Sequence, residues 1–383
     1  MTRTPVQPAE PAEPAAPVTP AVLELSRSAA QLTADLVDIE SVSGNEARIA
    51  DAVEAAVRRH GRLSVRRLGN VVIARTELGR AQRVVLAGHL DTVPIAGNLP
   101  SRLAEGRLHG CGTSDMKSGV ALQLRVAELV GTGALEPALD LTWLFYDCEE
   151  VEAARNGLNR VAAEHPELLQ ADLAILLEPT NGTVEGGCQG TMRAQLSTAG
   201  RRAHSARSWL GVNAIHLAAP ILARLTDYRA REVEVEGLTY REGLNAVFIE
   251  GGVAGNVIPD RCLVTVNYRF APDRSEAEAE AHLREVFEGF ELTVLDSSPG
   301  ARPGLDRPLA RQAVTALGGE VAAKLGWTDV ARFSALGIPA LNFSPGDPNL
   351  AHRADESVEL AQLERCERLL VGFLGNPPAG ATN

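Results

Sequence analysis

Apolar runs and helical periodicity alternate along the first half of the chain. The pattern predicts a helix that begins near Ala21, carries Leu32 and Leu36 on one side and stops at Ser41. Further along it predicts a helix over 46–60, strands over 70–75 and 83–87, a helix over 116–130, and strands over 139–146 and 173–177. Strands that alternate with helices are typical of an α/β fold in which helices flank an open sheet. We expect this sheet to be mixed rather than wholly parallel.

The pattern changes in the middle of the chain. There it predicts a strand over 192–198, a long helix over 213–229, strands over 246–250 and 262–270, a helix over 276–287 and a strand over 291–295. These elements make a complete α+β unit, and the chain then returns to helix and strand, with a strand over 341–343. We therefore expect a discontinuous catalytic domain over 21–191 and 304–383, with an inserted α+β domain over 192–303.

Composition excludes several classes of function. Residues 1–20 are mostly Pro, Ala, Glu, Val and Thr, and we expect them to form a disordered tail. The net charge is −12, from 49 acidic and 37 basic side chains, which argues against nucleic-acid and membrane partners and favours a small-molecule substrate. The 5 cysteines include no Cys-x-x-Cys pair, as expected of reduced thiols in the cytoplasm.

Five segments place a carboxylate or an imidazole at the edge of an apolar run. They are Gly88-His89-Leu90-Asp91, Gly112-Thr113-Ser114-Asp115, Cys148-Glu149-Glu150, Leu177-Glu178-Pro179 and Ala351-His352. Three of the segments follow predicted strands, and in an open α/β sheet such strand ends line a ligand crevice. The two imidazoles together with three of these carboxylates suit divalent ions such as zinc, and one shared carboxylate can hold two ions roughly 3.5–4 Å apart. The residues alone therefore predict metal-assisted hydrolysis.

Structural roles are the main alternative for these side chains. A single His or Asp at the end of a strand is more often a turn or cap residue than a metal ligand. Acids that follow apolar strands can also form salt bridges, here to Arg155 or Lys117. The joint pattern favours the metal site, because a buried carboxylate that is neither paired nor bound to a cation costs several kcal/mol.

Longer motifs resemble the zinc-dependent aminoacylase and carboxypeptidase family, from about Ala21 to Phe373. The family motifs are Gly88-His-Leu-Asp-Thr-Val-Pro94, Gly110-Cys-Gly-Thr-Ser-Asp-Met-Lys-Ser-Gly119, Asn256-Val-Ile-Pro259 and the Glu149-Glu150 pair. Within the family, Gly187-Cys-Gln-Gly190, Arg202-Ala-His-Ser-Ala-Arg-Ser-Trp209, Thr239-Tyr-Arg-Glu-Gly-Leu-Asn245 and Gly326-Trp-Thr-Asp329 are similar to the actinobacterial succinyl-diaminopimelate desuccinylases. The resemblance implies a zinc-peptidase-like catalytic domain and an inserted domain that acts as a lid and forms a homodimer.

The resemblance also implies a ligand set for two zinc ions, for which Co²⁺ is a substitute. One ion would be held by His89, Asp115 and Glu178. The other would be held by Asp115, Glu150 and His352, so that Asp115 bridges the two ions.

Three catalytic residues follow from the same resemblance. Glu149 would be the general base, and Asp91 would accept the other ring proton of His89 and fix its tautomer. His204, in the inserted domain, would reach the active site of the partner subunit and stabilise the oxyanion. For His204 taken alone, an exposed loop histidine is the alternative.

The implied reaction is hydrolysis of N-succinyl-LL-2,6-diaminopimelate to succinate and LL-2,6-diaminopimelate, in lysine and diaminopimelate synthesis. The expected substrate contacts are Arg207, Asn256, Arg269 and Thr328, with surface salt bridges as the alternative for the arginines. Some desuccinylases carry arginines where this chain has Cys188-Gln189, so that contact is not transferred.

Other functions remain open at this point. An N-acetylornithine deacetylase, an aminoacylase or a dipeptidase of the same family would use the same metal ligands. A cysteine hydrolase built on Cys111 or Cys148 with His109 is a different class, and it would resist chelators. A catalytically silent binding protein is a third interpretation, but such a protein would normally have lost Glu149 or a ligand.

Overall fold

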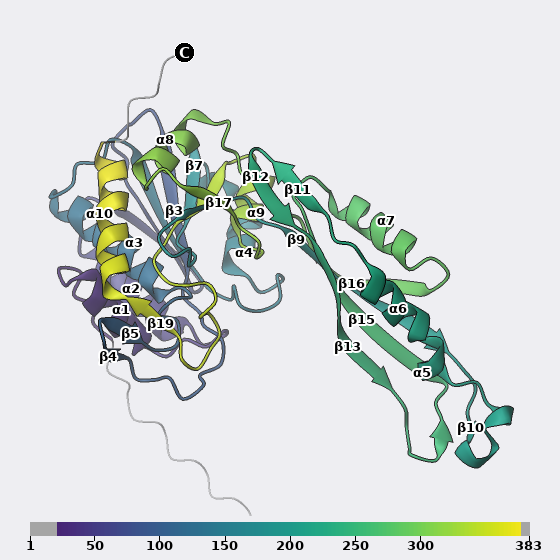
Figure 1. Ribbon diagram of the computed structural model, residues 1–383. Coiled ribbons are helices and arrows are strands. Elements are labelled where there is room, and N and C mark those ends of the chain that lie inside the picture. The colour runs from purple at the N-terminus through teal and green to yellow at the C-terminus, as the bar shows by residue number, and fades with distance from the viewer. Residues whose placement is uncertain (1–20, 377–383) are drawn as a thin grey trace, which may run out of the picture.

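The computed structural model describes residues 21–376, so the predicted tail over 1–20 and the segment 377–383 of the predicted catalytic domain lie outside the described residues. Figure 1 shows an α/β body from which a long arm extends to one side. An 8-stranded sheet forms the centre of the body, and a 4-stranded sheet forms the arm.

The central sheet of the body is mixed. Its strands, in spatial order, are β1 (Ser64–Leu68), β2 (Val71–Arg75), β6 (Asp140–Tyr146), β3 (Arg83–His89), β7 (Leu173–Leu176), β18 (Ala340–Asn342), β8 (Val184–Gly186) and β17 (Val321–Ala323). β3 runs parallel to β6 and to β7, and β7 runs parallel to β18. β2 is antiparallel to β6, and β8 is antiparallel to β18. The prediction of an open mixed sheet is confirmed.

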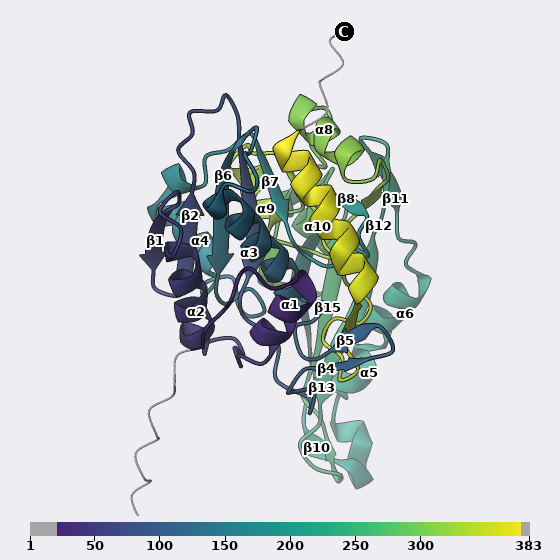
Figure 2. The same ribbon diagram turned by 90° about the vertical axis from the view of Figure 1, so that its left-hand side faces the viewer.

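Helices cover both faces of this sheet. One face packs against α1 (Ala29–Val37), α2 (Ala47–Arg58), α3 (Lys117–Thr132), α8 (Pro308–Ala316) and α10 (Leu360–Gly375), which Figure 2 shows in front of the strands. The other face packs against α4 (Gly157–Glu164) and α9 (Val330–Ala335). In β6, Trp143 and Phe145 belong to the first core, whereas Leu144 and Tyr146 belong to the second. Burial on both faces explains why this strand is a continuous apolar run.

The arm has its own sheet and its own core. The sheet is antiparallel, in the order β13 (Gly243–Gly251), β15 (Arg261–Phe270), β9 (Gly190–Ala199) and β16 (Glu291–Ser298). Helices α5 (Ala214–Leu217), α6 (Ala219–Asp227) and α7 (Glu276–Val286) cover one face of it, where Leu196, Ile221 and Val264 form part of a separate apolar cluster. This separate core supports an inserted domain over 192–303, whose boundaries stay a prediction.

Smaller elements complete the described chain. The arm ends in a tip where β10 (Ala203–His204) pairs with β14 (Val257–Ile258) beside the 3-10 helix η2 (Ser205–Leu210), and a hairpin of β11 (Glu232–Val235) and β12 (Leu238–Arg241) lies at its root. The body adds η1 (Pro166–Leu168) and a small sheet of β4 (Arg102–Ala104), β5 (Arg107–His109) and β19 (Ser357–Glu359). Within residues 21–376, no helix has both the length and the apolar character that crossing a membrane requires.

Two predicted helices were wrong in extent. The first begins at Ala29 rather than near Ala21, because the side chain of Ser28 accepts the N–H of Gln31 and caps the helix there. The helix predicted over 213–229 is divided into α5 and α6. Pro220 lies in the first turn of α6, and a proline in the middle of a continuous helix would lack the N–H and clash with the preceding turn.

Candidate metal centre and active site

The predicted metal ligands come from one edge of the central sheet and from two loops beside it. His89 is the last residue of β3, Glu149-Glu150 follow β6, and Glu178 follows β7. Because these three strands are parallel, their carboxyl ends meet at the same edge. Asp115 lies just before α3, and His352 lies in the loop between β18 and β19. The fold thus brings together segments that are far apart in the sequence.

Asp115 lies between two histidines. Its Oδ1 is 3.1 Å from Nε2 of His89, and its Oδ2 is 3.4 Å from Nε2 of His352. Oε1 of Glu178 lies 4.0 Å from the same atom of His89, and Oε1 of Glu150 lies 3.0 Å from the same atom of His352. The side chains form two groups that share Asp115, and within each group the ligand atoms lie within 4.8 Å of one another. Each carboxylate oxygen of Asp115 therefore faces one group.

The chemistry of this cluster fits divalent cations. Glu178 is buried, and its Oε1 has no hydrogen-bond partner among residues 21–376. Burial and the Asp115 carboxylate raise the pKa of Glu178 to about 8, and the hydrogen bonds to Asp115 and Glu150 raise the pKa of His352 to about 10. A buried carboxylate oxygen without a partner is costly unless a cation binds it. Cations bound here would replace the protons that otherwise balance the carboxylates.

Asp91 connects His89 to the glutamate pair. Nδ1 of His89 lies 3.0 Å from the main-chain carbonyl oxygen of Asp91 and 3.5 Å from its Oδ1. The Asp91 carboxylate also accepts the backbone N–H groups of Glu149 and Glu150, at 3.0 and 3.1 Å, and the hydroxyl of Ser43, at 2.7 Å. The resemblance implied that the Asp91 carboxylate accepts the ring proton of His89, but the main-chain carbonyl oxygen of Asp91 lies closer to that nitrogen, so the role of the carboxylate stays a prediction. The sequence did not reveal that Asp91 fixes the main chain of both glutamates.

Glu149 lies beside the metal-ligand cluster and faces a cleft. Its carboxylate lies within 4.8 Å of ligand atoms of His89 and Glu150. Burial outweighs the attraction of His89 and raises the pKa of Glu149 well above its ordinary value of 4.5. A carboxyl group whose pKa is raised in this way can both accept and return a proton near neutral pH.

Glu356 is a site residue that the sequence did not reveal. It is buried, and its carboxylate accepts the backbone N–H groups of Gly112, Ser114 and Asp115 at 3.0, 2.8 and 3.0 Å. Because Glu356 follows His352 closely in the chain, it ties the segment that carries His352 to the loop that carries Asp115. The polar run around it is typical of an exposed turn, so its burial could not be predicted from local pattern.

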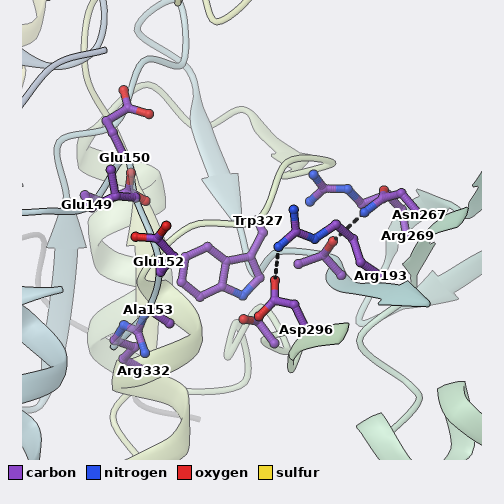
Figure 3. A pocket seen from close by; sticks show the side chains of 13 residues that line it. Glu149, Glu150, Glu152, Ala153, Arg193, Asn267, Arg269, Asp296, Trp327 and Arg332 are labelled. Carbon is purple, nitrogen blue, oxygen red and sulfur yellow. Dashed lines mark hydrogen bonds and ion pairs between the residues drawn. The ribbon is translucent and has the colours of Figure 1, made fainter. Parts of the chain in front are cut away.

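A cleft of about 540 Å³ lies between the glutamates and the root of the arm (Figure 3). It is lined by Glu149, Glu150, Val151, Glu152, Ala153, Trp327 and Arg332 of the body and by Thr191, Arg193, Asn267, Arg269, Asp296 and Ser298 of the arm. Its volume suits a small-molecule ligand. Arg269, a predicted substrate contact, lines the cleft. Thr328, another, is buried next to Trp327, and its hydroxyl donates to Oδ1 of Asn342 at 3.1 Å.

The remaining predicted residues lie at the tip of the arm. His204 belongs to β10, Arg207 belongs to η2, and Asn256 directly precedes β14. All three are exposed, and the N–H of Ser205 donates to the carbonyl of Asn256 at 2.9 Å. Figure 1 shows β10 at the end of the arm that is farther from the body. The structure therefore groups these residues together, but apart from the metal-ligand cluster of the same chain.

The two cysteines considered as nucleophiles are poorly suited to that role. Cys111 and Cys148 are buried, and burial raises the pKa of both thiols, that of Cys148 to about 12. The thiol of Cys148 donates to Oε1 of Glu46 at 3.3 Å. A catalytic cysteine needs a lowered pKa and a neighbouring base, so this geometry argues against a cysteine hydrolase.

Comparisons with known proteins agree with the fold and identify the family. Residues 85–376 match the model of peptidase family M20/M25/M40. The chain is 56% identical over 357 residues to a putative succinyl-diaminopimelate desuccinylase of Mycobacterium tuberculosis, covering 92% of this chain and 100% of that protein. It is 50% identical over 360 residues to the succinyl-diaminopimelate desuccinylase of Corynebacterium glutamicum, covering 92% and 97%. The structure of a tripeptidase from Staphylococcus aureus has a TM-score of 0.76 at 20% identity, covering 92% and 98%. The chain belongs to peptidase family M20/M25/M40.

Proposed function

We propose that the protein is a metal-dependent amidohydrolase that converts N-succinyl-LL-2,6-diaminopimelate and water to succinate and LL-2,6-diaminopimelate. The observation that carries this proposal is the placement of Asp115 between two ligand groups at the edge of a substrate-sized cleft. The substrate is supported by the identities of 56% and 50% to proteins named as desuccinylases over nearly the whole chain. We further propose a cytoplasmic location, because all five cysteines are buried and free.

Five residues would hold two zinc ions. His89, Asp115 and Glu178 would bind one ion, and Asp115, Glu150 and His352 would bind the other, with Co²⁺ as a substitute. Imidazole nitrogen and carboxylate oxygen are both common zinc ligands. Bound there, the ions would polarise the scissile carbonyl and lower the pKa of a water molecule.

Glu149 would move the proton that the hydrolysis requires. Its carboxylate would accept a proton from the attacking water as the water oxygen bonds to the amide carbon. It would then deliver that proton to the amide nitrogen as the C–N bond breaks, so that succinate leaves with the water oxygen and diaminopimelate leaves with a free amine. Asp91 would keep Glu149 in place through the hydrogen bond from its backbone N–H.

A homodimer formed through the arm is part of the proposal. β13 is an edge strand of the arm sheet, and its residues Val247, Phe248 and Ile249 are 45%, 63% and 53% exposed. An exposed apolar stretch on an edge strand is a surface to which a second chain can bind. The helices next to the arm sheet add further exposed apolar side chains, Ile215, Leu217 and Leu222.

Dimerisation would give the residues of the arm tip a function. His204 of one subunit would donate to the oxyanion in the cleft of the other, where Arg207 and Asn256 would contact the substrate. Phe248→Glu is expected to yield monomers in analytical ultracentrifugation and to lose turnover. A fully active monomer would exclude this arrangement.

A panel of acyl substrates tests the proposed reaction. The zinc-loaded protein is offered N-succinyl-LL-2,6-diaminopimelate, N-acetyl-L-ornithine, an N-acetyl amino acid and a dipeptide, and release of the free amine is measured. We expect kcat/KM to be highest for the succinyl compound. A higher value for any other substrate would replace the proposed reaction with that one.

A further inference from the structure

The root of the arm forms a polar wall of the cleft. Side chains alternate along β9, so that Met192 packs into the arm core while Arg193 faces the cleft. The cross-strand neighbours of Arg193 are Asn267 on β15 and Asp296 on β16, and both also line the cleft. Figure 3 shows these three side chains on the opposite side of the cleft from the glutamates.

The wall offers a cation and an anion side by side. Arg193 and Asp296 form an ion pair with a separation of 3.6 Å, and their side chains are 51% and 47% exposed. Arg193 therefore keeps free N–H donors, and Asp296 keeps free acceptor oxygens, on the side of the cleft. Nearby, Arg269 pairs with no carboxylate among residues 21–376, and burial lowers its pKa. Arg269 thus adds a second cationic side chain to the wall beside the Arg193–Asp296 pair.

An adjacent cation and anion complement the free end of an amino acid. That end carries a carboxylate and an ammonium on one carbon, so each group can bind the residue of opposite charge. N-succinyl-LL-2,6-diaminopimelate has such an end at the far side of a methylene chain from the amide that is cleaved. N-acetylornithine has only an ammonium there.

We propose that Arg193 and Asp296 form the subsite for this free amino-acid end, with Arg193 binding its carboxylate and Asp296 its ammonium. The inference rests on the proposed function and names the residues that would select the diaminopimelate part of the substrate. Because Glu149 and this wall line the same cleft, a substrate with its amide at Glu149 would place its far end against the wall.

Trp327 also lines the cleft, and its position suits contact with the methylene chain of the substrate. Figure 3 shows its indole between the glutamates and Arg193. The ring is fixed, because Nε1 donates to the carbonyl of Pro299 at 3.1 Å and the guanidinium of Arg332 stacks 5.2 Å from the ring centre. The apolar ring surface would pack against the methylene groups that join the two ends of the substrate.

A purely structural role is the competing explanation for this ion pair. Half-exposed cross-strand pairs contribute only modestly to sheet stability. A structural pair would affect unfolding and would treat all substrates alike. A substrate-binding pair would instead distinguish substrates by the charged groups at their far end.

Three substrates separate the two explanations. N-succinyl-LL-2,6-diaminopimelate carries both charged groups at its far end, N-succinyl-L-lysine carries only the ammonium, and N-succinyl-L-2-aminopimelate carries only the carboxylate. For Arg193→Gln we expect kcat/KM to fall roughly 10- to 100-fold, mainly through KM, for the diaminopimelate and aminopimelate compounds, because a hydrogen-bonded charge is lost. The same variant should cleave the lysine compound as the unmodified enzyme does. For Asp296→Asn we expect kcat/KM to fall for the diaminopimelate and lysine compounds, which carry the ammonium, and to stay unchanged for the aminopimelate compound.

A matched control comes from an ion pair on the helical side of the arm. Arg284 pairs with Glu280 at 2.6 Å and is exposed to a similar degree, 52%. Arg284→Gln should leave the kinetics with all three substrates unchanged. Equal losses on all three substrates, or unchanged kinetics with a lowered unfolding temperature, would assign Arg193 and Asp296 to sheet structure and overturn the subsite. If the unmodified enzyme does not cleave the diaminopimelate compound at all, the proposed function fails together with the subsite.

Discussion

Glu356→Gln tests whether the protein itself holds the loop of the bridging aspartate in place. Oε1 of Glu356 accepts the N–H groups of Ser114 and Asp115, and Oε2 accepts the N–H of Gly112. A glutamine has nearly the same shape but offers one acceptor oxygen and one NH₂ donor. At least one buried backbone N–H must then face a donor instead of an acceptor.

The size of the effect follows from these contacts. The best arrangement of the glutamine keeps the two bonds at the position of Oε1 and loses the bond from Gly112. Leaving one buried donor unpaired costs about 1–3 kcal/mol, and the remaining bonds weaken because their acceptor is no longer charged. We therefore expect the free energy of unfolding to fall by about 1–3 kcal/mol. Zinc affinity should fall by about 10- to 100-fold, as is typical when a partner of a metal ligand is removed.

Two measurements check the Glu356 prediction. Zinc affinity is obtained by competition with a chelator, and unfolding of the metal-free protein is followed in urea. Burial raises the pKa of Glu356 to about 7, so both are measured above that pH, where the carboxylate is charged. Glu359→Gln is the control, because Glu359 is a half-exposed acid of the same segment that pairs with Arg107. A folded Glu356→Gln protein that binds zinc as tightly as the unmodified one would refute the reasoning.

Three further predictions address the proton transfer, the dimer and the arm. Glu149→Gln should keep its zinc, measured by atomic absorption, and lose about 10²–10⁴ in turnover; near-normal turnover would remove Glu149 from the mechanism. His204→Ala should keep its zinc and lose about 10²–10³ in turnover. Mixing it with the Glu149→Gln protein should restore activity, because one of the two active sites in each mixed dimer then has both Glu149 and a partner His204. Mixed dimers that are verified but show no recovery would contradict a role of His204 across the interface. Glu242 is buried, and although burial alone would raise its pKa, the hydrogen bond from Arg231 lowers the pKa below the unfolded value of 4.5. The charged carboxylate therefore stabilises the folded protein above pH 4.5, and this contribution is lost as the pH falls through the lower folded pKa. Glu242→Gln should therefore lower the free energy of unfolding, measured in urea, by about 1–3 kcal/mol at pH 7 and by less in acid. An equal loss of unfolding free energy at the two pH values would contradict the stabilising role of the charged carboxylate.

The sequence was most informative where local pattern and site coincide. An apolar strand followed directly by an acid signals both the edge of a sheet and a carboxylate at that edge, as at Glu149-Glu150 and Glu178. His89 and Asp91 followed the same logic. Because parallel strands end at the same edge, the pattern of strands and acids is enough to predict that these segments lie together.

The sequence was least informative where a residue acts through partners far away in the chain. Glu356 looks like part of an exposed turn until the loop of Asp115 packs over it. The pairing of Arg193 with Asp296 depends on the register between β9 and β16, which local periodicity does not encode. The division between α5 and α6 is a different case, since Pro220 marks it in the sequence.

The central claim is that two cations share Asp115. Calorimetric titration of the metal-free protein with zinc, followed by turnover of N-succinyl-LL-2,6-diaminopimelate, tests it most directly. We predict two bound zinc ions and full activity only when both are present. His352→Ala should lose one ion, whereas Asp115→Ala should weaken both. A single zinc ion at full activity, or an Asp115→Ala protein that binds two ions with unchanged affinity, would contradict the account.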